Sequence, residues 1–122
     1  MNAKLLEPDV LFVLLPPEPQ LRPELVQLRE AASQGKDTHL ILDLSCIEII
    51  TSPSIGSLLL LQRQLAQRDR RLVLCNPRLA TKCIFRVAGL DVFFQLASDK
   101  NHALTLLHQP EQSLANDAPT KR

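Results

Sequence analysis

The sequence predicts a single small α/β domain, with a mixed sheet of four to five strands and about four helices. Short apolar runs alternate with segments of helical periodicity, a pattern typical of mostly parallel sheets with right-handed crossovers. The length, 122 residues, fits one domain. The composition, 45% hydrophobic and 22% charged, is that of a globular fold. We expect the domain to span residues 1–109 and a flexible polar tail to follow over 110–122.

Four apolar runs are predicted to form strands. They cover residues 10–15, 39–44, 71–75 and 93–96. The run HLILDL is apolar almost throughout, which indicates a central strand that is covered on both faces. Residues 4–6 are interpreted as the remnant of a further strand.

Four further segments are predicted to be helical. The first begins at Glu24, and the other three cover residues 54–68, 78–88 and 98–108. The segment PPEPQLRP, residues 16–23, is expected to be a connector because proline disfavours helix interiors and central strands. Gly35 and Gly89 are expected to end two of the helices, and Ser98 is expected to cap the last one.

The stretch SCIEIITSPSIGSLLLLQ, residues 45–62, joins an apolar run to a helix through a cluster of hydroxyls. Ser52 is the predicted N-cap, and Pro53 then takes the first helical position, where its missing N–H costs nothing. A helix start carries partial positive charge and free amides, so it suits a phosphate on a ligand or on a side chain. Ser54 and Ser57 lie in or near the same first turn.

The leucines that follow predict which side of this helix is buried. On a helical wheel, the inward side is formed by Ile55, Leu58, Leu61 and Leu65. Leu60 falls nearly opposite them, beside Gly56 and Arg63. We therefore predict that Leu60 faces solvent and that it can anchor a partner.

Charge and composition argue against several functions. The net charge of +1 and the scattered basic residues do not form the basic stripe of a nucleic-acid-binding protein. No apolar segment is long enough to insert into a membrane, and no signal peptide is visible at the start. We expect a cytoplasmic protein.

The sequence offers no constellation for catalysis. Its cysteines, at positions 46, 75 and 83, lack metal or redox spacing and are interpreted as small buried hydrophobic residues. The histidines, at 39, 102 and 108, have no cysteine or carboxylate at a diagnostic distance. Asp43 ends a strand and is expected to bind loop amides. We therefore expect that the protein is not an enzyme, has no catalytic residue and binds no metal or cofactor.

Several segments together resemble the STAS domain, the family of bacterial anti-sigma factor antagonists. ILDLSCIEII is similar to the central strand of the family and its following loop, and TSPSIGSLLLL stands where the family has an Asp-Ser-Ser-Gly-Leu-Gly motif at a helix start. RRLVLCNP is similar to the next strand, VAGLDVFFQL to the turn before the last strand, and SDKNHAL to the start of the final helix. The resemblance covers roughly residues 24–108.

This resemblance implies a STAS-like fold and a protein–protein switch that binds a serine-kinase anti-sigma factor. The kinase would phosphorylate a serine at the helix start, and the added charge would break the complex. The residues implied in partner binding are Thr51, Ser52, Pro53, Ser54, Gly56, Leu60 and Arg63. A weak homodimer is also left open.

The chain departs from the family motif where regulation is expected. Thr51 takes the place of the aspartate, and Pro53 takes the place of the serine that is phosphorylated in the family. Because proline has no hydroxyl, the phosphorylation candidates are Ser52 and Ser54, or the switch is lost. Other interpretations are a scaffold in a stress-signalling complex, a subunit of an ABC-type lipid transporter, and a small-ligand or nucleotide-binding module.

Overall fold

A computed structural model describes residues 2–35 and 37–109 and confirms the predicted α/β class. Five strands form one mixed sheet in the order β1-β2-β3-β4-β5. The strands are β1 (Ala3–Glu7), β2 (Val10–Leu14), β3 (His39–Asp43), β4 (Leu72–Cys75) and β5 (Gln95–Ala97). The helices are α1 (Leu21–Ser33), α2 (Ser52–Ala66), α3 (Leu79–Val87) and α4 (Lys100–His108), with a short 3₁₀ turn, η1 (Leu90–Val92), before β5.

The sheet is parallel except at one edge. β1 pairs antiparallel with β2, whereas β2, β3, β4 and β5 pair in parallel. The interpretation of residues 4–6 as a strand remnant is thus confirmed, since they lie in a five-residue edge strand. β3 is central, and its residues from Leu40 to Asp43 are all buried, as its continuous apolarity predicts.

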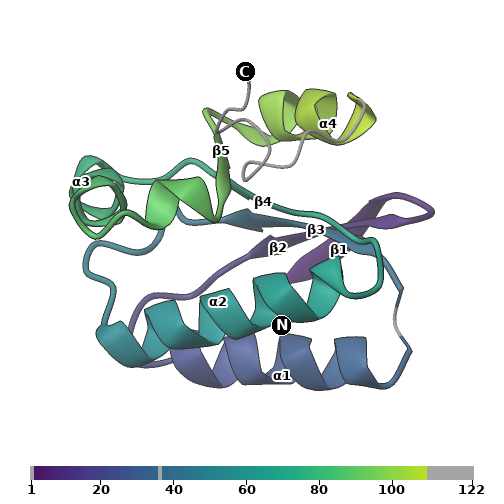
Figure 1. Cartoon of the computed structure of the whole chain (residues 1–122), viewed down its shortest axis with the longest axis horizontal. Helices are drawn as coiled ribbons and strands as arrows, with labels where there is room; N and C mark the ends of the chain where they lie inside the picture. The colour runs from purple at the N-terminus through teal and green to yellow at the C-terminus, as the bar shows by residue number, and fades with distance from the viewer. Residues whose placement is uncertain (1, 36, 110–122) are drawn as a thin grey trace.

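Helices cover both faces of the sheet, with α1 and α2 on one face and α4 on the other (Figure 1). Successive side chains of a strand point to opposite faces, so β3 supplies both layers. Leu40 and Leu42 belong to the larger core, which also contains the apolar side chains of α1 and α2. Ile41 packs in the smaller core beneath α4, together with Val73 and Ala103.

All four helix starts differ from the prediction, by one to three residues. α1 begins at Leu21 rather than at Glu24, so the connector after β2 is shorter than residues 16–23. Pro23 fits because it lies in the first turn, where an N–H has no partner within the helix. α4 is capped by Asp99, whose carboxylate accepts a hydrogen bond from the His102 amide at 2.8 Å, and not by Ser98.

The last strand is also shorter than predicted. Phe93 and Phe94 precede β5, and the Phe94 ring packs 5.5 Å from the Phe85 ring, measured between centroids. Gly35 and Gly89 follow helices as predicted, with φ angles of +91° and +73° that favour glycine. The tail predicted over 110–122 lies outside the described residues.

The three cysteines do not share one environment. Cys75 is buried in β4, and burial raises the pKa of its thiol to about 12. Cys46 and Cys83 are exposed, so the interpretation of the cysteines as buried hydrophobic residues is wrong for those two.

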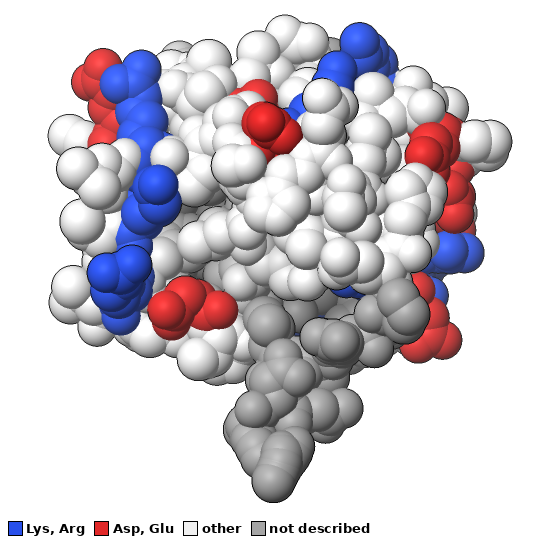
Figure 2. Space-filling view, turned by 90° about the horizontal axis from the view of Figure 1, so that it is seen from above, with Lys and Arg blue, Asp and Glu red and all other residues white. Residues whose placement is uncertain are grey.

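Charge is unevenly distributed on the side of the molecule that carries α4. Figure 2 shows lysine and arginine gathered in a column along one end of this side, where α3 lies in Figure 1. The start of α2 lies at the same end of the molecule (Figure 1).

Candidate functional site at the start of helix α2

The loop before α2 leaves the carboxyl end of the central strand and is fixed by Asp43. Its carboxylate accepts hydrogen bonds from the Ser45 amide at 2.8 Å and from Asn76 Nδ2 at 2.9 Å. These contacts confirm the structural role predicted for Asp43. Because Asn76 follows β4, Asp43 also connects the loop of one strand to that of its neighbour.

The N-cap of α2 is Thr51, and the prediction of Ser52 is wrong. Thr51 has extended backbone angles, φ −91° and ψ 160°, and its Oγ1 accepts a hydrogen bond from the Ser54 amide at 3.4 Å. Ser52 already belongs to the helix and Pro53 is its second residue. Thr51 thus caps the helix at the position where the family motif has aspartate, another capping residue.

Glu18 completes this helix start and was missed by the sequence analysis. The Thr51 amide and the Thr51 hydroxyl both donate to Glu18 Oε2, each at 2.9 Å. The Ser54 hydroxyl lies 3.3 Å from Thr51 Oγ1. A threonine hydroxyl has one proton, so we assign it to the shorter contact, with Glu18. No local motif marks Glu18, because it lies 33 residues before Thr51.

The hydrogen bonds at this site favour the ionised form of Glu18. Burial by itself would raise the pKa of its carboxyl group, but hydrogen bonds from Ser54 and Thr51 outweigh burial and lower the pKa. Glu18 is therefore a carboxylate at neutral pH, placed at the positive end of the α2 dipole. The Glu18 carboxylate thus places a negative charge next to Thr51, at the position where the family motif has an aspartate.

The two phosphorylation candidates occupy different environments. Ser52 is exposed in the first turn of α2, whereas Ser54 has 0% of its surface exposed. Ser57, one turn further, is buried as well. Of the two candidates, only Ser52 offers its hydroxyl to solvent.

The side of α2 that continues from Ser52 is solvent-exposed. Gly56 is half-buried, Leu60 is 45% exposed and Arg63 is exposed. Residues three and four apart lie along one side of a helix, so Ser52, Gly56, Leu60 and Arg63 form a continuous strip, which we call the α2 face. The predicted exposure of Leu60 is confirmed.

The opposite side of α2 contributes to the core. Leu58, Leu61 and Leu65 are buried as predicted, while Ile55 is only half-buried. The structure therefore brings together on one exposed rim all of the predicted partner-binding residues except Ser54. Thr51 and Pro53, both exposed, mark its beginning.

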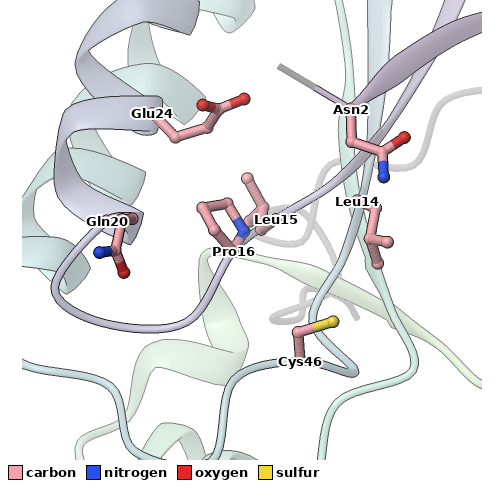
Figure 3. Close-up of a pocket in the computed structure, with 7 residues that line it drawn as sticks. All are labelled: Asn2, Leu14, Leu15, Pro16, Gln20, Glu24 and Cys46. Carbon is pink, nitrogen blue, oxygen red and sulfur yellow. The ribbon is translucent and has the colours of Figure 1, made fainter.

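Two hollows lie beside the connector after β2, and one of them reaches the rim at Thr51. One has a volume of about 510 Å³ and is lined by Pro17, Glu18, Cys46, Glu48, Ile49 and Thr51. The other, of about 370 Å³, is lined by Asn2, Leu14, Leu15, Pro16, Gln20, Glu24 and Cys46 (Figure 3). Cys46 lines both, and Ile49 is 72% exposed at the first. These hollows extend the candidate surface beyond α2.

Within residues 2–35 and 37–109, no group of three His, Cys, Asp or Glu side chains is arranged to hold a metal ion. In the same ranges, every helix is too short or too polar to cross a membrane.

Comparisons with known proteins agree with the resemblance. A family model described as "Mlab, STAS domain" matches residues 20–98. No curated protein sequence matches the chain significantly.

Solved structures of low sequence identity share the fold. The protein TM1081 of Thermotoga maritima, assigned as an anti-sigma factor antagonist, has a TM-score of 0.77 at 15% identity, covering 88% of this chain and 94% of its own. An anti-sigma-factor antagonist (STAS) domain protein of Planctomyces limnophilus has a TM-score of 0.74 at 16% identity, with 89% and 100% covered. The Bacillus cell fate determinant SpoIIAA in its phosphorylated form has a TM-score of 0.67 at 18% identity, with 88% and 98% covered.

Proposed function

Because the chain belongs to the STAS domain family, we propose that it is an anti-sigma factor antagonist, a cytoplasmic binding module without enzymatic activity. The observation that carries this proposal is the exposed α2 face, which begins at a helix start with an accessible hydroxyl at Ser52 and continues to Leu60. The fold shared with antagonists of other organisms supports it. The proposed partner is a serine-kinase anti-sigma factor.

The chemistry of the α2 face suits a protein partner. Leu60 offers an aliphatic anchor, and an anchor of this kind contributes most when the partner excludes water around it. Gly56 lets another backbone approach the helix closely. Arg63 can form an ion pair with a carboxylate of the partner at the edge of the interface. Such a pair raises the rate of association more than it raises the affinity.

Charge at Ser52 is the proposed means of regulation. A phosphate would add about −1.5 to −2 charges at neutral pH. On Ser52 it would stand beside the Glu18 carboxylate that already accepts two hydrogen bonds from Thr51. A partner that excludes water here would strengthen the repulsion between the two charges and remove the hydration of the phosphate, and both effects would oppose docking. Ser54 would have to leave its buried position before a kinase could reach it.

The experiment is affinity purification of the tagged chain from its native cells, followed by identification of the bound proteins and of any phosphosite. We expect a serine-kinase anti-sigma factor with the wild type, and its loss with Leu60→Asp. Leu5→Asp is the matched control, because Leu5 is 60% exposed on β1, outside the α2 face. Both variants should melt within a few degrees of the wild type, since exposed substitutions change stability by only about 0.5 kcal/mol. Recovery of the kinase with Leu60→Asp would refute the α2 face as its docking site.

A second candidate has one observation in its favour. The matching family model is described as Mlab, a name distinct from those of the antagonists among the solved structures. A subunit of an ABC-type lipid transporter would use the same α2 face with a different partner. Recovery of an ABC-type ATPase in place of a kinase and a sigma factor would support this second function and overturn the first.

A further inference from the structure

A second exposed surface lies on α3, next to the loop that leads into α2. Arg78, the N-cap of α3, donates from Nε to the Ser45 carbonyl at 2.9 Å and lies 3.6 Å from Glu48. The inward side of α3 is held by Phe85, which is 0% exposed and packs against Phe94. These contacts fix the orientation of α3, so that its outer side faces solvent.

Two rows of side chains run along this outer side, each with a spacing of four residues. One row is basic and the other is apolar, and neighbouring members are one turn apart on the helix. The basic row is Arg78, Lys82 and Arg86, and the apolar row is Leu79, Cys83 and Val87. We call these six residues the α3 face.

The apolar row is fully presented to solvent. Leu79 is 74% exposed and Val87 is 88% exposed, and Cys83 lies exposed between them. A single exposed leucine needs no explanation, but a row along the whole helix makes a contiguous strip. Each residue adds about 1.5 Å along a helix, so the strip is about 12 Å long. This length matches two turns of a partner helix.

The basic row is largely uncompensated. Among the described residues, the only ion pair on this face joins Arg78 to Glu48, an exposed glutamate. Lys82 and Arg86 make no side-chain hydrogen bond or ion pair there. Figure 2 shows a column of lysine and arginine at the end of the molecule where α3 lies in Figure 1. A partner that covers the apolar row would therefore gain by placing carboxylates along its edge.

We propose that the α3 face docks an acidic amphipathic helix of the protein partner. The apolar side chains of that helix would pack on Leu79 and Val87, and its carboxylates would face Lys82 and Arg86. A helix is favoured over a membrane because the strip is one residue wide, two turns long and without an aromatic side chain. The inference rests on the proposed function only in taking the partner to be a protein, and it extends the interface from α2 to α3.

The probe is a synthetic helical peptide with leucines on one face and glutamates along both flanks. Its binding to the isotope-labelled full chain is mapped by amide chemical shifts, and its affinity is measured as salt is raised. We expect shifts concentrated at residues 78–87 and an affinity that falls with salt. A control peptide with lysine in place of glutamate should not bind.

Matched variants separate the two rows. Leu79→Asp should weaken peptide binding by at least about tenfold through the apolar row. The double variant Lys82→Glu and Arg86→Glu should also weaken peptide binding, because it reverses the charge of the basic row. It should remove most of the salt dependence of the affinity. The controls, Leu5→Asp and Arg22→Glu, change exposed residues on β1 and α1 and should leave binding unchanged.

Three results with the peptides would overturn the inference. They are the absence of peptide binding, shifts that map away from α3, and equal binding of the lysine peptide. Binding of phosphatidylglycerol vesicles that depends on Leu79 and Lys82, without peptide binding, would assign the face to a membrane and overturn it too. Leu60→Asp should leave peptide binding intact, so this test and that of the α2 face fail independently.

Discussion

At the scale of single residues, the start of α2 shows how neighbouring hydroxyls take different roles. Thr51 caps the helix, Ser52 points to solvent, and Ser54 is buried beneath them. The sequence places these hydroxyls side by side but does not distinguish their roles, because a shift of one residue in the helix start exchanges them. Capping depends on the backbone angles of the residue, and these are set where the loop joins the helix.

The cap can be tested with two adjacent substitutions. Thr51→Ala removes the acceptor for the Ser54 amide and the hydroxyl donor to Glu18, and it should lower the free energy of unfolding by about 1 kcal/mol. Ser52→Ala is the matched control and should change it by less than about 0.5 kcal/mol. Urea unfolding measures both. An equal loss in the two variants would show that the cap is shared or misassigned.

At the scale of elements, the connector between β2 and α1 is coupled to the start of α2 through Glu18. A connector was correctly predicted over residues 16–23, but it is shorter because α1 begins at Leu21. Pro23 lies in the first turn of that helix, where proline is tolerated. The contact of the connector with Thr51 was not predictable, since it joins positions that are distant in the chain. The helical wheel of α2 was more informative, because burial of Leu58 and Leu61 and exposure of Leu60 follow from periodicity.

Glu18→Gln should make the stability difference from the wild type depend on pH. The folded-state pKa of Glu18 lies below its ordinary value of 4.5, so its ionised form stabilises the fold above that value. This contribution is lost as the pH falls through the lower folded-state pKa. At pH 7 the variant should be less stable by up to about 1 kcal/mol, because the group is partly exposed.

The measurement is chemical denaturation of both proteins from neutral to strongly acidic pH. The difference should be constant above the ordinary glutamate pKa and should shrink toward zero in strong acid. Glu30→Gln, a change of an exposed glutamate on α1, is the control and should show no such trend. A difference that grows as the pH falls would contradict the assigned direction of the pKa shift.

At the scale of the whole molecule, α4 is held on its face of the sheet by a small core and by polar contacts that include those of one arginine. The Arg71 guanidinium donates to the Leu107 carbonyl at 3.3 Å, to the Gln109 carbonyl at 3.2 Å and to Gln95 Oε1 at 2.8 Å. Arg71 precedes β4, so it joins the sheet to the end of α4. Unsatisfied carbonyls at a helix end are favourable sites for a cation.

Arg71→Ala should loosen α4 without unfolding the rest of the domain. Amide hydrogen exchange in Lys100–His108 should accelerate by roughly tenfold, as expected for the loss of hydrogen bonds to a charged group. Exchange in α1 and α2, on the opposite face, should stay near the wild-type rate. Arg68→Ala, at an exposed arginine after α2, is the control. Uniform acceleration over the whole domain would show that Arg71 contributes only to global stability.

The amino-acid sequence by itself determined the alternation of strands and helices, the central position of β3 and the buried side of α2. These follow from hydrophobic periodicity, which depends on local geometry alone. Only the tertiary structure decided that Thr51 caps α2, that Glu18 supplies a carboxylate there, and that α3 exposes a basic and an apolar row next to the α2 loop. The contact of Glu18 with Thr51 and that of α3 with the α2 loop depend on which distant segments meet when the chain folds. The choice of Thr51 as the cap depends on the backbone angles where the loop joins the helix, and hydrophobic periodicity encodes neither.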